Sequence, residues 1–277
     1  MIWQTSRFRI DLTRPQVMGI VNATPDSFSD GGRYASADAA RAHCELLVAQ
    51  GADILDIGGE STRPGARLPD TAEQLERVLP VLRHAVTLGV PVSVDTADPL
   101  VMAAALDLGV DILNDVRALQ APGALAAAAA HPRAGICLMH MQGEPGSMQV
   151  APHYDGDDVV AAVSAFLAAR RDAALASGIA LERIVLDPGI GFGKTPAHNR
   201  ALAVHQGRLL ELGCPLLLGW SRKSTLGQIT GRPVGERLAG SLAAAVAAVA
   251  RGAAIVRVHD VAETVDALKV WRALASD

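Results

Sequence analysis

The chain has 277 residues, of which 50% are hydrophobic and 19% charged, and its formal net charge is −4. This composition can fill one large core and suits a single domain of about 250 residues. The negative charge, without a basic tract, argues against a nucleic-acid partner. No apolar stretch reaches the ~18 residues that span a bilayer, and residues 1–7 lack the order of a signal peptide. We therefore expect a cytoplasmic protein with no membrane partner.

Apolar runs and amphipathic stretches alternate along the chain. After a short strand pair predicted within residues 3–12, the apolar runs lie at residues 16–21, 54–57, 92–94, 112–113, 135–138, 184–186, 216–218 and 255–256. Helical patterns fill the intervals, at residues 37–50, 71–88, 98–108, 157–177, 196–212, 236–251 and 262–275, with a short alanine-rich helix after Pro122. A buried parallel strand is a continuous apolar run, because helices cover both of its faces. Eight strand–helix units predict an α/β fold in which residues 1–277 form one (β/α)₈ barrel.

Polar residues follow the apolar runs, and barrel active sites lie at the C-terminal ends of the strands. Asp95, Asn114 and Asp187 each end or follow a run. Two carboxylates and an amide form an acceptor-rich surface that suits a flat heterocycle presenting several N–H groups. The alternative for Asp95 is a helix cap, although Asp98 is better placed for that role.

A second group of strand-end residues is basic. Arg257 and His259 lie two apart on one strand and so point the same way, which suits an anion clamp; the alternative is a surface ion pair with Asp260. The segment 221–224, Ser-Arg-Lys-Ser, follows the seventh run, where barrels commonly bind phosphate. His140, at another strand end, reads as a hydrogen-bonded rim residue rather than a catalytic one.

The segment 187–195, Asp-Pro-Gly-Ile-Gly-Phe-Gly-Lys-Thr, ends like a nucleotide-binding P-loop. Pro188 stands where that pattern requires glycine, so we reject a nucleoside triphosphatase. We expect these glycines to let the backbone approach a ligand closely, with Phe192 offering an apolar face.

Several of these segments together resemble the dihydropteroate synthase family, a group of pterin-binding barrels. The matching motifs occur in the family's order and lie at residues 18–30, 53–65, 138–142, 187–195, 219–224 and 255–260. The resemblance implies condensation of 6-hydroxymethyl-7,8-dihydropterin pyrophosphate with para-aminobenzoate, giving 7,8-dihydropteroate and pyrophosphate. It also implies Mg²⁺ bound to the pyrophosphate and, as in relatives, a homodimer.

The resemblance also implies residue roles. The pterin would bind Asp95, Asn114, Met139, Asp187, Gly219 and Lys223. The pyrophosphate would bind Asn22, Thr62, Arg63, Ser221, Arg257 and His259, with Mg²⁺ on Asn22. Para-aminobenzoate would lie against Phe28, Pro64, Phe192 and Ser224. The candidate catalytic residues are Asp95, Lys223, Arg257 and His259.

Three other functions compete with this one. A pterin-dependent methyltransferase shares the acceptor edge but needs no pyrophosphate clamp. A non-catalytic paralogue would bind pterin without turnover. A phosphosugar lyase is the most distant, because no lysine lies mid-strand where a Schiff base would form.

Overall fold

The computed structural model of the chain describes residues 1–23, 32–60, 69–144 and 146–275, with the side chains of residues 32–36 and 157 outside the description. Eight parallel strands form one sheet in the order β8-β7-β6-β5-β4-β3-β10-β9. They are β3 (Gln16–Asn22), β4 (Ile54–Gly58), β5 (Val92–Asp95), β6 (Ile112–Asp115), β7 (Gly135–Met139), β8 (Ile184–Asp187), β9 (Leu217–Leu218) and β10 (Ile255–Val258). A parallel bridge between Leu186 and Leu216 brings the two ends of the sheet together. The predicted eight-stranded barrel is confirmed.

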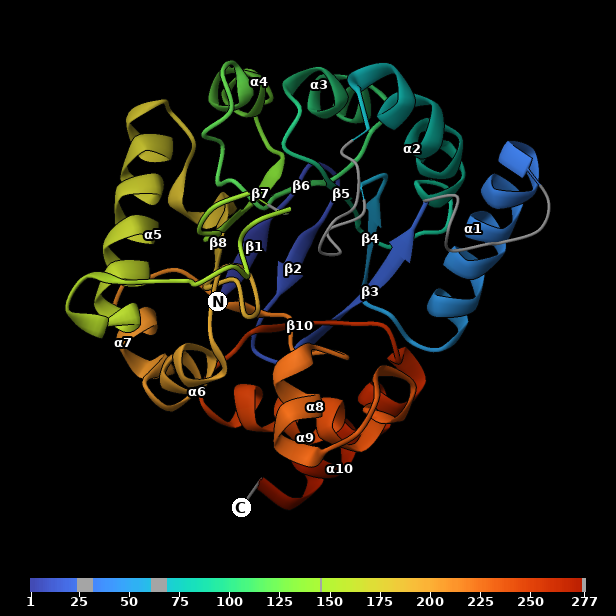
Figure 1. The fold of residues 1–277 in the computed structure, drawn as a ribbon. Helices are drawn as coiled ribbons and strands as arrows, with labels where there is room; N and C mark the ends of the chain where they lie inside the picture. Colours follow the sequence, from blue (N-terminus) through green and yellow to red (C-terminus); the bar gives the residue numbers. More distant parts are fainter. Residues whose placement is uncertain (24–31, 61–68, 145, 276–277) are drawn as a thin grey trace.

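Helices surround the strands as a ring (Figure 1). They are α1 (Gly32–Ala49), α2 (Thr71–Ala85), α3 (Pro99–Asp107), α4 (Ala124–Ala130), α5 (Val159–Ala176), α6 (Pro196–Val204), α7 (Gln206–Leu210), α8 (Ser224–Thr230), α9 (Leu238–Ala250) and α10 (Val261–Ala275). Asp98 caps α3 by accepting the backbone N–H of Leu100 at 2.8 Å, which leaves Asp95 available to the barrel interior. No helix among the described residues is long and apolar enough to cross a bilayer.

One predicted helix is interrupted. The pattern at 196–212 forms two helices, because His205 leaves helical geometry at φ −102° and ψ 24°. The next residue, Gln206, is 1% exposed and donates through Nε2 to the carbonyl oxygens of Ala248 and Arg251 at 2.9 and 3.0 Å. Burial of this polar side chain against the end of α9 is the physical reason for the break, since a buried amide requires partners.

The barrel interior changes from apolar to polar along its axis. At the N-terminal end, one cluster of buried side chains comprises Trp3, Ile10, Met18, Ile54, Ile112, Cys137, Val185, Leu217 and Ile255. Side chains alternate faces along a strand, so residues two positions further on also point inward. Those positions carry Ile20, Asp56, Asn114, Met139, Asp187, Gly219 and Arg257. The alternation therefore places most of the predicted pterin residues, together with Arg257, inside the C-terminal half of the barrel.

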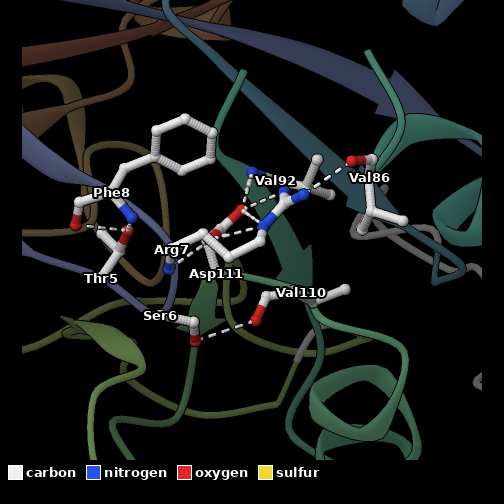
Figure 2. Close-up of polar contacts among 8 residues, drawn as sticks. All are labelled: Thr5, Ser6, Arg7, Phe8, Val86, Val92, Val110 and Asp111. Carbon is white, nitrogen blue, oxygen red and sulfur yellow. Dashed lines mark hydrogen bonds and ion pairs between the residues drawn. The ribbon is translucent and has the colours of Figure 1, made fainter. Parts of the chain in front are cut away.

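The N-terminal strand pair closes the opposite end. β1 (Ile2–Gln4) and β2 (Arg9–Asp11) pair antiparallel, as predicted, and lie within the ring of helices in Figure 1. Trp3 is fully buried and donates from Nε1 to the carbonyl oxygen of Arg183 at 2.8 Å. Figure 2 shows the connecting turn, where Arg7 Nη2 lies 2.6 Å from the buried carboxylate of Asp111. That carboxylate also accepts the backbone N–H of Val92 at 2.9 Å, so the pair is tied to the barrel floor.

Candidate active site

A cavity of about 1310 Å³ opens at the C-terminal ends of the strands. Every predicted site residue that the structure describes lines it: Asn22, Asp95, Asn114, Met139, Asp187, Phe192, Gly219, Ser221, Lys223, Ser224, Arg257 and His259. The other four, Phe28, Thr62, Arg63 and Pro64, lie outside the described residues. Residues separated by more than 230 positions thus meet in one cavity, because all the strands are parallel and end at the same rim.

The predicted acceptor edge is formed by Asp95 on β5, Asn114 on β6 and Asp187 on β8. Burial raises the pKa of Asp95 to about 7, with Arg257 opposing part of that effect, and raises the pKa of Asp187 to about 6. The backbone N–H of Gly189 donates to Asp187 Oδ1 at 2.7 Å. Ionised carboxylates held in a desolvated site bind strongly to a ligand that brings N–H donors.

Arg257 joins two of the site carboxylates. Its Nε donates to Asp56 Oδ2 at 2.6 Å, and its Nη2 donates to Asp95 Oδ2 at 2.7 Å. Burial works against the charged guanidinium, but Asp56 and Asp95 outweigh it and raise the pKa of Arg257. Asp56 is not among the site residues predicted from the sequence. A lone charged residue in the apolar run 54–57 was the signal, because β4 is buried at every position.

Lys223 lines the cavity beside Phe192. Its Nζ lies 4.0 Å from the centroid of the Phe192 ring, a cation–π contact. Burial, followed by repulsion from Arg257, lowers the pKa of Lys223 to about 8. Gly191 keeps room for this side chain, since a Cβ there would lie 3.2 Å from Lys223 Cδ. The ammonium therefore remains mostly charged at neutral pH, beside an apolar ring face.

His259 and Ser221 form a neutral hydrogen-bonding pair at the rim. His259 Nδ1 and Ser221 Oγ lie 3.0 Å apart. Burial, with Arg222 and Arg257 nearby, lowers the pKa of His259 to about 4. The imidazole is therefore neutral at pH 7 and can offer an anion a hydrogen bond but no charge.

The turn that carries Ser221 and Lys223 depends on Arg222. This residue adopts φ 59°, the left-handed region that non-glycine residues rarely occupy. Asp260 binds its side chain through Nη2 at 2.5 Å and Nε at 3.1 Å, and the Ser241 hydroxyl accepts its backbone N–H at 3.0 Å. Asp260 thus pairs with Arg222, and not with Arg257 or His259 as the alternative prediction had it.

Two glycines of the segment 187–195 have a packing role that was not predicted, while Gly191 lines the cavity. A Cβ at Gly189 would lie 1.9 Å from the carbonyl oxygen of His140, and a Cβ at Gly193 would lie 2.3 Å from that of Gln142. These two glycines let the loop pack on the backbone that follows β7. Lys194 is buried as well and holds the loop from inside, with Nζ 3.0 Å from the Phe192 carbonyl oxygen and 2.9 Å from His140 Nδ1.

Adding a methyl group at Gly189 should test this packing. Gly189→Ala is expected to destabilise the protein by about 2 kcal/mol more than Gly178→Ala, measured by urea denaturation. Both glycines have positive φ, at 67° and 85°, but nothing lies within 4 Å of a Cβ at Gly178. The control therefore isolates backbone strain from the clash with His140. Equal losses would show that the loop does not depend on this contact.

Comparison with known proteins assigns the chain to a family. The model of the family described as "Pterin binding enzyme" matches residues 18–259. Dihydropteroate synthase of Neisseria meningitidis serogroup B is 55% identical over 99% of this chain and 97% of the relative. The Escherichia coli K12 enzyme of the same name is 48% identical over 96% and 94%.

Solved structures agree with the sequence relatives. Yersinia pestis dihydropteroate synthase with a sulfonamide drug complex superposes with a TM-score of 0.93 at 46% identity, covering 100% of both chains. The Xanthomonas albilineans enzyme with 4-aminobenzoic acid gives a TM-score of 0.93 at 50% identity, again covering 100% of both chains. The chain therefore belongs to the pterin binding enzymes, and within them to the dihydropteroate synthase family.

Proposed function

We propose that this chain condenses 6-hydroxymethyl-7,8-dihydropterin pyrophosphate with para-aminobenzoate, releasing 7,8-dihydropteroate and pyrophosphate. The observation that carries the proposal is the acceptor edge of Asp95, Asn114 and Asp187 in one cavity with Arg257 and Lys223. A pterin presents adjacent ring N–H and amino donors, which match a row of acceptors. The cations in the same cavity match the pyrophosphate of the same substrate.

The leaving group departs first in the proposed reaction. The bond between the pterin methylene carbon and the pyrophosphate oxygen breaks, and the electron-rich ring stabilises the resulting cation. Arg257 and Lys223 neutralise charge that develops on the leaving oxygen, while the Ser221–His259 pair donates one hydrogen bond to it, from the Ser221 hydroxyl or from His259 Nε2 according to the tautomer. Asp95, beside the ring, would stabilise the methylene cation electrostatically.

The arylamine nitrogen then attacks the methylene carbon, and its surplus proton passes to solvent. The amine is neutral at pH 7, so the reaction needs no strong general base. His140 is not suited to that role, because it is buried against Phe166 and burial lowers its pKa to about 3. Phe192, which packs with Met139 and Met148, and Ser224 at the first turn of α8 would bound the para-aminobenzoate.

Mg²⁺ fits this site as an ion carried by the pyrophosphate. Asn22 ends β3 at the cavity wall, and its side-chain oxygen is a suitable hard ligand. Among the described residues, no three His, Cys, Asp or Glu side chains group to hold a metal on their own. Mg²⁺ typically uses one or two protein ligands together with substrate phosphates and water. When bound, the ion would neutralise part of the pyrophosphate charge.

We also propose that the protein is a cytoplasmic homodimer. Apolar side chains are exposed on three consecutive helices, with Ile229 on α8 at 70%, Leu238 on α9 at 39% and Val270 on α10 at 59%. A dimer that buried these side chains would remove them from water. Light scattering of the purified chain tests the oligomeric state.

A pyrophosphate-release assay tests the activity directly. Release should require the pterin pyrophosphate, para-aminobenzoate and Mg²⁺ together, and 7,8-dihydropteroate should accumulate in equal amount. Sulfonamides, which mimic para-aminobenzoate, should compete with it. Release at the same rate without the arylamine would indicate a hydrolase, and a methylated product without pyrophosphate would favour the methyltransferase.

A further inference from the structure

Asp56 is a buried carboxylate whose hydrogen-bond partners are two residues of the cavity. It is 0% exposed and points into the barrel, one inward position above Ile54 on β4. Its Oδ2 accepts from Arg257 Nε at 2.6 Å and from Asn114 Nδ2 at 3.1 Å. Its Oδ1 has no hydrogen-bond partner among the described residues. A buried charge is costly without partners. A carboxylate with one unpaired oxygen at this position therefore lowers stability, which points to a role in function.

The contact with Asn114 determines which end of that amide faces the ligand. An amide carries a donor end and an acceptor end, and an ionised carboxylate only accepts. Asp56 therefore holds the NH₂ group of Asn114, and the Asn114 carbonyl oxygen is left as the group available to the cavity. With the amide reversed, two acceptors would face each other at 3.1 Å in a buried site.

The contact with Arg257 orients the guanidinium in the same way. With Nε on Asp56 and Nη2 on Asp95, the plane of the guanidinium is fixed at two points. Nη1 has no hydrogen-bond partner among the described residues and remains for an anion. One oxygen of Asp56 thus sets both the acceptor pattern of the pterin edge and the direction of the nearest cation.

We infer that Asp56 is a positioning residue that gives the cavity its selectivity for a ligand with contiguous N–H donors. This inference rests on the proposed function, since it assigns the pterin edge to Asn114. The acceptor oxygen of Asp56, more than its charge, determines which ligand the cavity prefers. A role in stability alone would not affect that preference.

Two variants separate the acceptor from the charge. Asp56→Leu removes both, while Asp56→Asn keeps a carbonyl oxygen that can occupy the Oδ2 position and accept from Arg257 and Asn114. The probes are 6-hydroxymethylpterin and 6-hydroxymethyllumazine, which carries a carbonyl acceptor in place of the 2-amino donor, and inorganic pyrophosphate. Calorimetry gives the affinity of each, and thermal denaturation verifies that each variant is folded.

Wild-type protein should prefer the pterin strongly. Asp56→Leu should bind the pterin about tenfold or more weakly and lose most of the preference over lumazine, because Asn114 is free to turn. Asp56→Asn should keep the preference within about threefold, and should bind pyrophosphate as well as or better than wild type, since one negative charge near Arg257 is gone. A merely structural role would weaken all three ligands together.

Asp111→Asn is the matched control for Asp56→Asn. Asp111 is also 0% exposed and also accepts from an arginine, Arg7, but it lies at the barrel floor outside the cavity. The substitution Asp111→Asn should lower stability without changing ligand preference. Unchanged preference in Asp56→Leu, or loss of preference in Asp56→Asn as complete as in Asp56→Leu, would overturn the inference. Wild-type protein that binds no pterin would instead refute the proposed function.

Discussion

Asp187→Asn should bind the pterin at least 100-fold more weakly and yet be more stable than the wild-type protein. The loss of binding follows because an amide can present a donor to a donor, and because a buried charge-assisted hydrogen bond becomes a neutral one. The gain in stability follows because burial raises the pKa of Asp187 to about 6, which means that its ionised form is unfavourable in the folded protein. The variant keeps a side-chain oxygen for the backbone N–H of Gly189.

The pH dependence of this stability difference has a definite sign. The folded pKa of about 6 lies above the value of about 3.9 expected in the unfolded chain. Between these values the folded state binds more protons than the unfolded state, so this group makes wild-type stability fall as pH rises. The variant should therefore match the wild type below about pH 4 and exceed it by about 2–3 kcal/mol above pH 7. Denaturant titrations at pH 4, 6 and 8 measure this, and a variant that was less stable at pH 8 would contradict it.

Arg257→Met should destabilise the protein by about 3–5 kcal/mol at pH 8, because Asp56 and Asp95 would remain buried without their shared cation. The penalty should shrink as pH falls through the pKa of Asp95, since the protonated carboxyl no longer needs the cation. In the double variant with Asp56→Asn, one of the two uncompensated charges is removed, and a substantial part of the stability should return.

Arg257→Met should also show which part of the substrate Arg257 binds, the pterin or the pyrophosphate. Affinity for the pterin pyrophosphate should fall far more than affinity for the bare pterin, because the proposed role of Arg257 is to bind the pyrophosphate. Calorimetry with the two ligands at a temperature where the variant is folded gives the comparison. Equal losses for both ligands would place Arg257 outside the pyrophosphate subsite.

The alternation of side chains along strands is strong enough to predict most of the site. Asp95, Asn114 and Asp187 follow apolar runs, and parallel strands must bring their C-terminal ends to one rim. The inward position of Arg257 follows from the same rule. The packing of the 188–195 loop was not predictable, because the carbonyl oxygens that exclude a side chain at Gly189 and Gly193 belong to another strand's loop.

The role of Asp56 depends on contacts that no local pattern contains. Its partner Arg257 is 201 residues away, and the two strands that carry them are separated in the sheet by β3. A charge within an apolar run indicates that some buried partner exists. Only the closed barrel shows that this partner is Arg257.

The strand pair β1–β2 has a consequence for the order in which the protein folds. Arg7 finds its carboxylate 104 residues later in the chain, and the carbonyl group that receives the Trp3 indole lies 180 residues later. Trp3 therefore cannot make its native hydrogen bond before Arg183 has been synthesised. Contacts between such distant residues form slowly, because the entropy of closing the loop is lost before the contact compensates for it. Sealing of the barrel floor is thus a late event in folding, because both contacts wait for segments that lie more than 100 residues further along the chain.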